Sequence, residues 1–338
     1  MMSSSRDIVV IGPVYPYKGG ISHYTGLLVR ALQKRFRVHT ISYSMQYPKL
    51  LFKREQRDYE NDSFKVDADF ILNTADPFNI LKTAARINAI APGLVIIQWW
   101  HPYFAPCYRI LAKRIKARIM FICHNVFPHE RFVMDRILTR WTLSCGDCFI
   151  LHSQKEVSEL KGIIKEPEYR VNMHPTYDAF NFSGDTPENK VTGTLLFFGF
   201  IRPYKGLRYL LEAMKLVDKD IRLMVVGDFG NDRPAYEALI NSPELKGRLD
   251  IHDEYVPDRQ VEIYFKTCDA VVLPYIDATQ SGIAQIAFGF GKPVIATDVG
   301  GLPEVVADGK TGIICKSADS EALAAGIRKF YELKKEVD

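Results

Sequence analysis

The sequence contains no long uninterrupted run of apolar residues, and this absence argues against a transmembrane helix. Apolar residues make up 47% of the 338 positions, yet no window reaches the roughly 18 consecutive apolar residues that a membrane span requires. The first apolar run, Ile8–Ile11, is too short for the core of a signal peptide, so we expect it to form a strand.

Cysteines are few for a chain of this length. The six cysteines are scattered, which is typical of reduced thiols in a cytoplasmic protein and not of a disulfide framework. Cys145 and Cys148 form a CxxC pair without a second pair elsewhere. A strand edge is therefore a better interpretation of this pair than a zinc or redox site.

The sequence also lacks a GxGxxG motif after its first apolar run, which disfavours a dinucleotide cofactor. The run is followed instead by Gly12-Pro13 and then by Lys18-Gly19-Gly20 ahead of a predicted helix. Glycines at these places allow a sugar or a phosphate to approach the backbone closely. No short-period repeat and no low-complexity segment is present.

The charge is distributed unevenly along the chain. Residues 1–180 hold 25 Lys and Arg against 16 Asp and Glu, whereas the remainder holds 19 against 24. A basic half often meets an anionic surface, either nucleic acid or anionic lipid. Ordinary solvated helix faces are an equally good interpretation. A nucleic-acid partner is disfavoured because the basic residues accompany no recognised binding motif.

Short apolar, β-branched runs recur along the chain with helical stretches between them. Such runs indicate parallel sheets covered on both faces, and two series predict two Rossmann-like domains, 1–180 and 181–338, with a cleft between them. The seam is expected within 175–191, and the last helix is able to cross back to the first domain. The predicted strands are Ile8–Ile11, Val38–Ile41, Leu94–Ile97, Ile119–Ile122, Cys148–Leu151, Thr194–Phe198, Leu223–Val226, Ala270–Leu273 and Pro293–Ala296.

The strongest motif in the second half is a strand-to-helix turn with two cations. Gly199 ends a predicted strand, Arg202 and Lys205 follow, and a helix is expected near Gly206. Fixed cations beside the backbone N–H groups of a helix start favour an anion. Arginine can bind two phosphate oxygens at once, and lysine supplies a point charge. A solvated basic loop is the alternative.

Two further turns in the second half follow predicted strands. Gln280-Ser281-Gly282 precedes a helix, and Gly300-Gly301 follows the strand that ends at Ala296. Both offer backbone N–H groups that a phosphate can approach. Each glycine motif is weak evidence alone, and three such turns in one domain strengthen the prediction.

Polar and aromatic residues follow two predicted strands of the first half. His124 comes after one of them, and Trp99, Trp100 and His101 come after another. A histidine here can bind a ligand hydroxyl or can be structural. Adjacent tryptophans cannot both face one core, so at least one is expected to line the cleft, where aromatic rings stack on sugars. A packed loop is the alternative.

Together these residues resemble the retaining glycosyltransferases of family 4, which have the two-domain GT-B architecture. The resemblance covers nearly the whole chain and is strongest over Phe197–Ala213 and Pro274–Gly312. It implies that Arg202 and Lys205 neutralise the diphosphate of a nucleotide sugar and that His124 contacts the donor sugar. The remaining implied donor contacts are Gly19, Gly20, Gly199, Gly227, Tyr255, Val256, Gln280, Ser281, Gly282 and Glu304, and the implied acceptor contacts are Tyr17, His23, Trp99, Trp100 and His101.

The sequence departs from the family pattern at two places. Phe200 stands directly after Gly199, where the family usually has its arginine, and Arg202 comes two residues later. Ala278 and Ile286 occupy the positions of the usual glutamate pair, so that the ribose contact is unassigned. These missing carboxylates leave open a non-catalytic GT-B subunit that binds nucleotide or activates a partner. A sugar-nucleotide epimerase is a second alternative.

The resemblance implies transfer of a sugar with retention, in surface polysaccharide or lipid-linked glycan synthesis. Cationic side chains replace a metal, so we expect no metal and no cofactor, and Asp67–Asp69 and Asp218–Asp220 are interpreted as surface turns. An acceptor held at the inner face of the cell membrane fits the basic first half. Leu50–Arg54 and Leu111–Arg118, which mix apolar and basic residues, are the predicted contacts with anionic lipid.

Overall fold

The computed structural model describes residues 7–48, 50, 55–59, 64–128, 131–176, 180 and 192–337. The chain divides into two compact units, Met1–Asn172 and Met173–Asp338. The predicted seam, 175–191, lies mostly outside the described residues. Among the described residues, no helix combines the length and the apolar character that a bilayer span requires.

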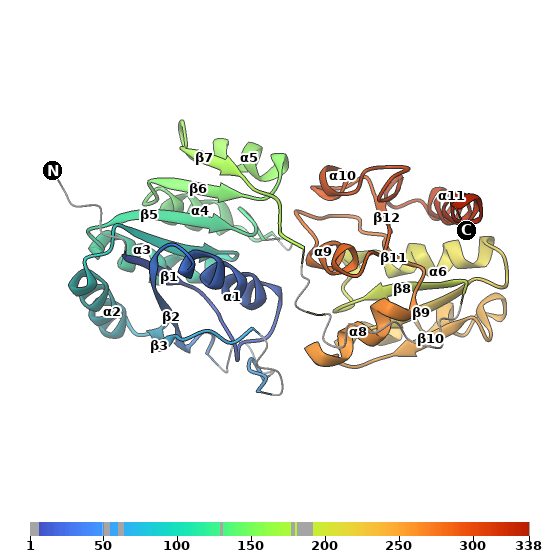
Figure 1. The fold of residues 1–338 in the computed structure, drawn as a ribbon, viewed down its shortest axis with the longest axis horizontal. Coiled ribbons are helices and arrows are strands. Elements are labelled where there is room, and N and C mark those ends of the chain that lie inside the picture. Colours follow the sequence, from blue (N-terminus) through green and yellow to red (C-terminus); the bar gives the residue numbers. More distant parts are fainter. Residues whose placement is uncertain are drawn as a thin grey trace. The chain divides into compact units, whose positions relative to one another are not determined.

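The first unit is built on a parallel sheet (Figure 1). β1 lies at the point where the strand order reverses, between β2 and β4, and its register pairs Val10 with both Thr40 and Ile96. In such open sheets ligands bind at the carboxyl ends of the strands next to this point. The strands, in spatial order, are β3 (Asp69–Asn73), β2 (Arg37–Met45), β1 (Asp7–Ile11), β4 (Leu94–Trp99), β5 (Arg118–Cys123), β6 (Cys148–Leu151) and β7 (Tyr169–Val171).

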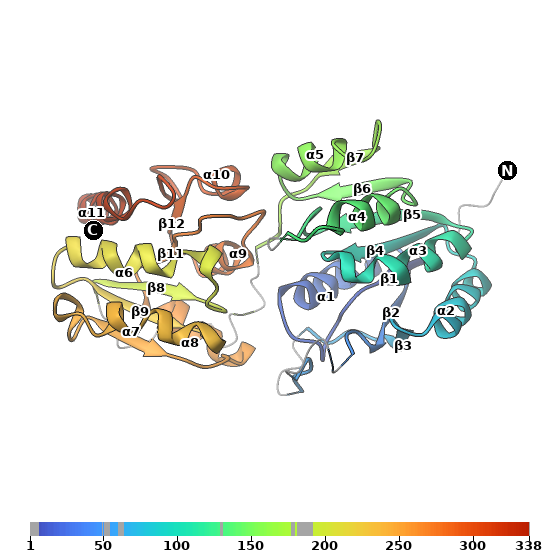
Figure 2. The ribbon, with the colours of Figure 1, turned by 180° about the vertical axis from the view of Figure 1, so that it is seen from behind.

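Both faces of this sheet are covered, because alternate residues of each central strand point to opposite sides. Ile8 and Val10 pack with α1 (Gly20–Gln33), which lies in front of the sheet in Figure 1. Val9 and Ile11 join the larger core on the other face, which Figure 2 shows from behind. The helices on that side are α2 (Pro77–Ile90), α3 (Ala105–Arg114), α4 (Asp135–Leu143) and α5 (Gln154–Lys161).

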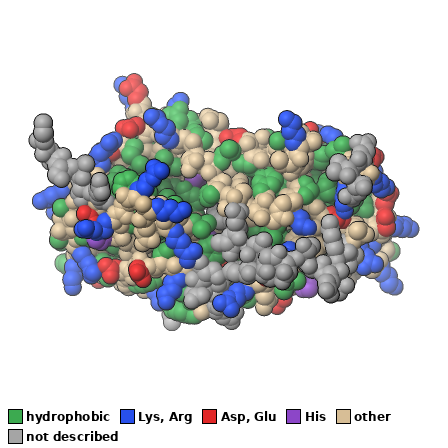
Figure 3. All heavy atoms as spheres, in the orientation of Figure 1, with side chains coloured by type: hydrophobic (Ala, Val, Ile, Leu, Met, Phe, Trp, Pro, Cys, Tyr) green, Lys and Arg blue, Asp and Glu red, His purple; other side chains and the backbone are tan. Residues whose placement is uncertain are grey.

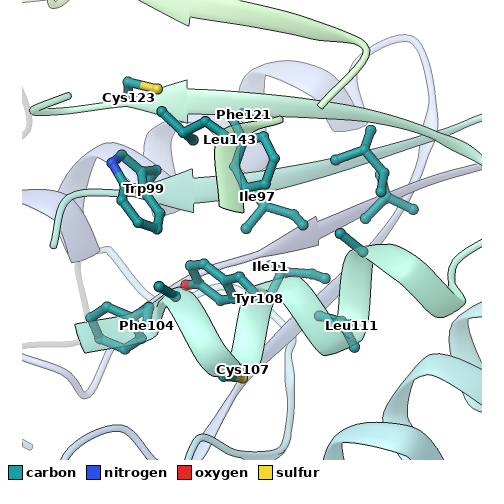
Figure 4. Close-up of a cluster of buried hydrophobic side chains, with 14 of the residues drawn as sticks. Ile11, Ile97, Trp99, Phe104, Cys107, Tyr108, Leu111, Phe121, Cys123 and Leu143 are labelled. Atoms are coloured by element: carbon teal, nitrogen blue, oxygen red, sulfur yellow. The ribbon is translucent and has the colours of Figure 1, made fainter. Parts of the chain in front are cut away.

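Large aromatic side chains fill the main core of the first unit. Trp99, Phe104 and Tyr108 are all fully buried, and the rings of Phe104 and Tyr108 stack 5.4 Å apart. Figure 4 shows these two rings beneath Trp99 and Ile97 of β4. Each buried ring removes a large apolar area from water, so α3 and the preceding turn η1 (Pro102–Phe104) are tied firmly to the sheet.

The second unit repeats this plan with a six-stranded parallel sheet, in which β8 lies at the point of reversal, between β9 and β11. One face is covered by α6 (Leu207–Leu216) and α11 (Ser320–Val337), which pack against each other. The other helices are α7 (Glu237–Ile240), α8 (Asp258–Thr267), α9 (Gly282–Gly289) and α10 (Leu302–Val305). The strands, in spatial order, are β10 (Leu249–His252), β9 (Arg222–Val226), β8 (Thr194–Phe198), β11 (Ala270–Leu273), β12 (Val294–Thr297) and β13 (Gly312–Cys315).

All nine predicted strands are present, with ends that differ by a few residues, and four further strands were not predicted. Those four, β3, β7, β10 and β13, are the edges of the two sheets. An edge strand is only half enclosed, so its sequence is short or interrupted by polar residues, as in Leu249-Asp250-Ile251-His252. The predicted α/β class with two parallel sheets is confirmed.

α5 begins with a reciprocal cap whose carboxylate is buried. Ser153 Oγ accepts a hydrogen bond from the Glu156 backbone N–H (3.3 Å), and Glu156 Oε2 accepts one from the His152 backbone N–H (2.7 Å). Burial raises the pKa of the Glu156 carboxyl to about 8. The folded protein therefore holds a proton there that an unfolded glutamate, with a pKa of about 4.3, has lost at neutral pH.

Replacing Glu156 by Gln tests this buried proton. Because the folded-state pKa is raised, the stability that the protonated form contributes is complete below about pH 4 and is lost as the pH rises to about 8. Glu156→Gln cannot ionise, so its melting temperature relative to wild type should increase from pH 5 to pH 8.5. The exposed Glu168, which pairs with Arg118, provides the control Glu168→Gln. A difference that is constant with pH at Glu156 would contradict the assignment.

Candidate functional site

Two glycines shape the turn that joins β8 to α6. Gly199, with a φ of 101°, ends β8, and Gly206, with a φ of 68°, is the N-cap of α6. A Cβ on Gly206 would lie 1.9 Å from the carbonyl oxygen of Pro274, so the turn is pressed against the residue that follows β11. Between the glycines, Pro203–Lys205 form the short helix η3. The predicted strand, cationic loop and helix are therefore all present.

Lys205 carries its ammonium group back toward the end of β8. Its Nζ lies 5.8 Å from the centroid of the Tyr275 ring. It also lies close to Gly199, since a Cβ added there would be 3.0 Å from Nζ. Burial, and then the positive charge of Arg202, lower the pKa of Lys205 to about 8. Among the described residues, neither cation forms an ion pair with a carboxylate. Two partly buried like charges that have no carboxylate partner in the described part of the chain favour a bound anion.

An aromatic pair adjoins the cations. The Arg202 guanidinium lies 5.9 Å from the centroid of the Phe200 ring, and Phe200 stacks on Tyr255 with centroids 6.3 Å apart. Tyr255 was predicted as a donor contact, whereas Phe200 was noted only as a departure from the family pattern. The partly exposed ring of Phe200 beside this predicted contact is a feature of the candidate site that the sequence analysis missed. The signal was its position directly after Gly199.

The ends of four strands in the second unit meet through their backbones. A Cβ on Gly227, after β9, would lie 2.2 Å from the carbonyl oxygen of Gly199, after β8. A Cβ on Gly300, after β12, would lie 1.8 Å from the carbonyl oxygen of Ala278, after β11. The glycines therefore bring the predicted donor contacts of these turns to one edge of the sheet.

The turn before α9 places the predicted contacts in different environments. Ser281 is buried, and its Oγ accepts a hydrogen bond from the Ala284 backbone N–H (3.4 Å) as the N-cap. Any contact of Ser281 with a ligand would therefore run through the backbone N–H groups at the start of α9, Gly282 included. The Gln280 amide packs against Gly301, where a Cβ would lie 2.3 Å from its Nε2. Val256 is buried, and Glu304 is exposed in the first turn of α10.

His124 belongs to a buried polar cluster in the first unit. Its Nε2 donates to Gln98 Oε1 (2.7 Å). A Cβ on Gly12 would lie 2.5 Å from Gln98 Cγ, so the end of β1 packs against the residue that orients the ring. The Tyr24 ring stands edge-on to His124 at 4.8 Å.

A second histidine, His152, lies beside His124 and was not predicted. It follows β6 as His124 follows β5, and the two ring centroids are 5.4 Å apart. His152 Nδ1 donates to the carbonyl oxygen of Asn172 (2.6 Å). Burial lowers the pKa of His152 to about 4, so the ring is neutral at physiological pH. The signal in the sequence was a histidine at the carboxyl end of a parallel strand.

Two predicted acceptor contacts are structural residues. Trp99 is fully buried and donates from Nε1 to the carbonyl oxygen of Val126 (3.2 Å). Tyr17 is buried and donates from its hydroxyl to the carbonyl oxygen of Tyr43 (2.8 Å). The prediction of a ligand contact through these side chains is therefore wrong, because their rings belong to the core and their polar atoms bond to the backbone.

The other residues predicted for the first unit are more accessible. Gly19 has a φ of 102° and is the N-cap of α1, and ideal Cβ atoms on Gly19 and Gly20 would meet nothing within 4 Å. His23 packs its ring on Phe64 with centroids 4.3 Å apart. Trp100 is half-buried, with Nε1 donating to the Tyr47 hydroxyl (3.1 Å), and His101 is half-buried as well. These positions remain predictions.

The two acidic pairs interpreted as surface turns are exposed. Asp67 lies two residues before β3, and Asp69 is the first residue of β3, where it pairs with Arg86 (2.8 Å). Asp218 and Asp220 lie between α6 and β9. Neither pair is close in sequence to the carboxyl ends of the strands, where the cations lie, and the expectation that no metal is needed stays a prediction.

Comparison with protein families covers both units. The model described as Glycosyltransferase Family 4 matches residues 18–173, and the model described as Glycosyl transferases group 1 matches residues 192–332. The chain belongs to glycosyltransferase family 4. The family that the sequence resemblance predicted is therefore confirmed.

Among curated proteins, this family 4 chain is 30% identical over 176 residues to a GDP-mannose:glycolipid 4-beta-D-mannosyltransferase of Xanthomonas campestris pv. campestris, covering 51% of the chain and 48% of that relative. It is 29% identical over 149 residues to a D-inositol 3-phosphate glycosyltransferase of Corynebacterium glutamicum, covering 42% of the chain and 35% of that relative. The chain thus spans about half the length, or less, of the curated relatives it matches.

Among solved structures, the chain is similar to the sucrose-phosphate synthase of Thermosynechococcus elongatus, with a TM-score of 0.72 and 19% identity over 96% of this chain and 90% of that one. It is also similar to Anabaena HepE in complex with UDP-glucose, with a TM-score of 0.73 and 16% identity over 98% and 91%. These likenesses show the GT-B fold.

Adding a methyl group at Gly300 tests the backbone contact between the turns. Gly300→Ala brings a Cβ against the Ala278 carbonyl in a backbone with a φ of 55°. Gly291→Ala is the matched control, because its φ is 64° and its Cβ would meet nothing within 4 Å. We expect the control to lose about 1 kcal/mol of unfolding free energy, and Gly300→Ala to lose more. Equal losses in urea denaturation would contradict the close approach.

Proposed function

We propose that the chain transfers a sugar from a nucleotide-diphosphate sugar to an acceptor hydroxyl with retention of the anomeric configuration. The observation that carries the proposal is the pair of cations, Arg202 and Lys205, at the carboxyl ends of the strands without a carboxylate partner among the described residues. A diphosphate supplies the missing negative charge and becomes more negative as it leaves. Family membership and the UDP-glucose bound in Anabaena HepE support this choice of ligand.

In the proposed reaction the bond between the sugar C1 and the diphosphate oxygen breaks as the acceptor oxygen bonds to C1 from the same face. The departing diphosphate takes the acceptor's proton, so no carboxylate nucleophile is required. Arg202 and Lys205 stabilise the charge on the leaving group. His124 contacts the donor sugar, and Gln98 orients its ring. The aromatic pair of Phe200 and Tyr255 lies beside the cations as a platform for the nucleobase.

We further propose that the acceptor is a glycan or a lipid-linked sugar in surface polysaccharide or lipid-linked glycan synthesis, reached by peripheral contact with the cytoplasmic face of an anionic membrane. The Xanthomonas relative is named for a glycolipid acceptor, which supports a lipid-linked class. The basic first half supports an anionic surface. On the face shown in Figure 3, lysine and arginine side chains lie singly or in small groups among neutral and hydrophobic ones.

Removing each cation tests the leaving-group assignment. With UDP-, GDP- and ADP-sugars as donors, Arg202→Ala and Lys205→Ala should each lower kcat/KM by about 100-fold or more, because a preorganised charge at the leaving group is lost. Lys215→Ala, which removes a lysine of α6 that pairs with Glu212, is the control. Near wild-type turnover in both variants would overturn the assignment. The anomeric configuration of the product, determined by NMR, tests retention separately.

The pH dependence tests the state of Lys205. Its pKa of about 8 predicts that kcat/KM for the donor falls as the pH rises above 8, because the free enzyme then loses the ammonium charge. Lys205→Arg keeps its charge across this range. The variant should therefore show no decline between pH 7.5 and 9.5 from this group, even where its activity is lower. The same decline in both proteins would assign it to another group.

A further inference from the structure

α4 buries several polar residues and exposes two large apolar ones, unlike an ordinary surface helix. Its inward face carries Asp135, Thr139 and Thr142, all buried, together with Leu143. The buried Thr142 hydroxyl donates a hydrogen bond shared between the carbonyl oxygens of Leu138 (3.0 Å) and Ala105 (3.3 Å). Leu138 and Leu143 still pack on the core, whereas Ile137 and Trp141 are exposed, opposite to the arrangement that packing on the sheet would select.

The exposed apolar side chains of this segment are large and contiguous. Five of the sixteen large hydrophobic residues that are exposed in the described part of the chain fall within the ten positions 132–141. Ile137 and Trp141 lie one turn apart on α4, and Phe132, Val133 and Met134 directly precede the helix. The five residues and their exposed fractions are Phe132 (42%), Val133 (96%), Met134 (50%), Ile137 (61%) and Trp141 (43%).

Arginines accompany these apolar residues. Arg136 and Arg140 are exposed and one helical turn apart, and the Arg109 guanidinium lies 5.3 Å from the centroid of the Trp141 ring. The one acidic residue between positions 131 and 143 is Asp135, which is buried and forms an ion pair with Arg131. The outward face is therefore apolar and positively charged, which matches the headgroup region of an anionic bilayer. Two copies of the surface facing each other would oppose arginine to arginine.

We propose that residues 132–141, with Arg136 and Arg140, form the surface by which this protein docks on an anionic lipid bilayer; we call it the α4 surface. The proposal deepens the membrane contact of the proposed function and places it elsewhere than the sequence predicted. In Leu111–Arg118, Leu111, Ala112 and Ile115 are core residues, so that the segment presents mainly basic side chains. Of Leu50–Arg54, residues 51–54 lie outside the described residues.

The α4 surface adjoins a predicted acceptor contact within the same unit. The ring of Phe132 stacks on His101 with centroids 6.2 Å apart and an interplanar angle of 23°. His101 in turn accepts a hydrogen bond at Nδ1 from the Tyr103 backbone N–H (3.0 Å), which fixes the ring. An acceptor whose lipid lies in the bilayer would therefore present its sugar end beside His101 when the α4 surface is docked.

Vesicle binding of the full chain tests the α4 surface. Wild type should co-sediment with phosphatidylcholine vesicles that contain phosphatidylglycerol and only weakly with phosphatidylcholine alone. Ile137→Ser combined with Trp141→Ser should weaken binding about tenfold or more, because two apolar contacts are lost. Arg136→Gln combined with Arg140→Gln should lower binding to the anionic vesicles to the level seen with neutral ones.

The control replaces two exposed apolar residues elsewhere in the first unit. Phe78→Ser combined with Leu81→Ser removes two exposed residues of α2 (83% and 39%) and should change binding less than twofold. Equal loss in the α2 and α4 variants would overturn the proposal, as would unchanged binding of both α4 variants. The proposal would also be overturned if the α4 variants changed only the oligomeric state, measured by light scattering without vesicles. The α4 surface would then bind a second copy of the chain.

Fluorescence gives a readout that is independent of sedimentation. Trp99 is fully buried, so a vesicle-induced blue shift that disappears in Trp141→Phe would place Trp141 at the bilayer, and a shift that persists would contradict this. Transfer to a water-soluble acceptor is measured in parallel. Activity there with no vesicle binding would overturn the α4 surface alone, whereas binding without any transfer would count against the proposed reaction and leave the α4 surface supported.

Discussion

The second unit depends on the close approach of backbone to backbone at the carboxyl ends of its strands. Gly199 and Gly227 meet after β8 and β9, while Gly206 meets Pro274 and Gly300 meets Ala278. At each contact the nearest atom to an added Cβ is a carbonyl oxygen, which cannot move aside as a side chain can. The turns are therefore fixed relative to one another, and the charges of Arg202 and Lys205 are held in place before a ligand arrives. Preorganisation of this kind is what makes charge stabilisation effective.

The central strands and the cationic turn could be predicted from the sequence because their signals are local. A continuous apolar run such as Thr194–Phe198 is specified by burial on both faces, and a glycine with two following cations is visible without knowledge of its neighbours. The edge strands could not be predicted in this way. β10 and β13 are strands because β9 and β12 pair with them, and that pairing is a property of the assembled sheet.

The environments of aromatic and histidine residues were less predictable for the same reason. The expectation that Trp99 and Trp100 cannot both face one core was wrong, because Trp100 follows β4 and packs on Phe104, against the same core that buries Trp99. His124 and His152 are 28 positions apart in the sequence and become neighbours only through the pairing of β5 with β6. α4 shows the converse, because it buries Thr139 and Thr142, whose polarity is typical of a solvated face, and exposes Ile137 and Trp141.

The lowered pKa of Lys205 also has a thermodynamic consequence for the cationic turn. With a pKa of about 8, about a tenth of the molecules carry a neutral amine at pH 7, and about half do so at pH 8. In the proposed function, an anion bound beside this group favours the ammonium form, so that its binding would take up protons from the solvent. The heat of binding would then depend on the ionisation enthalpy of the buffer, and binding and release of the anion would change the charge of the turn.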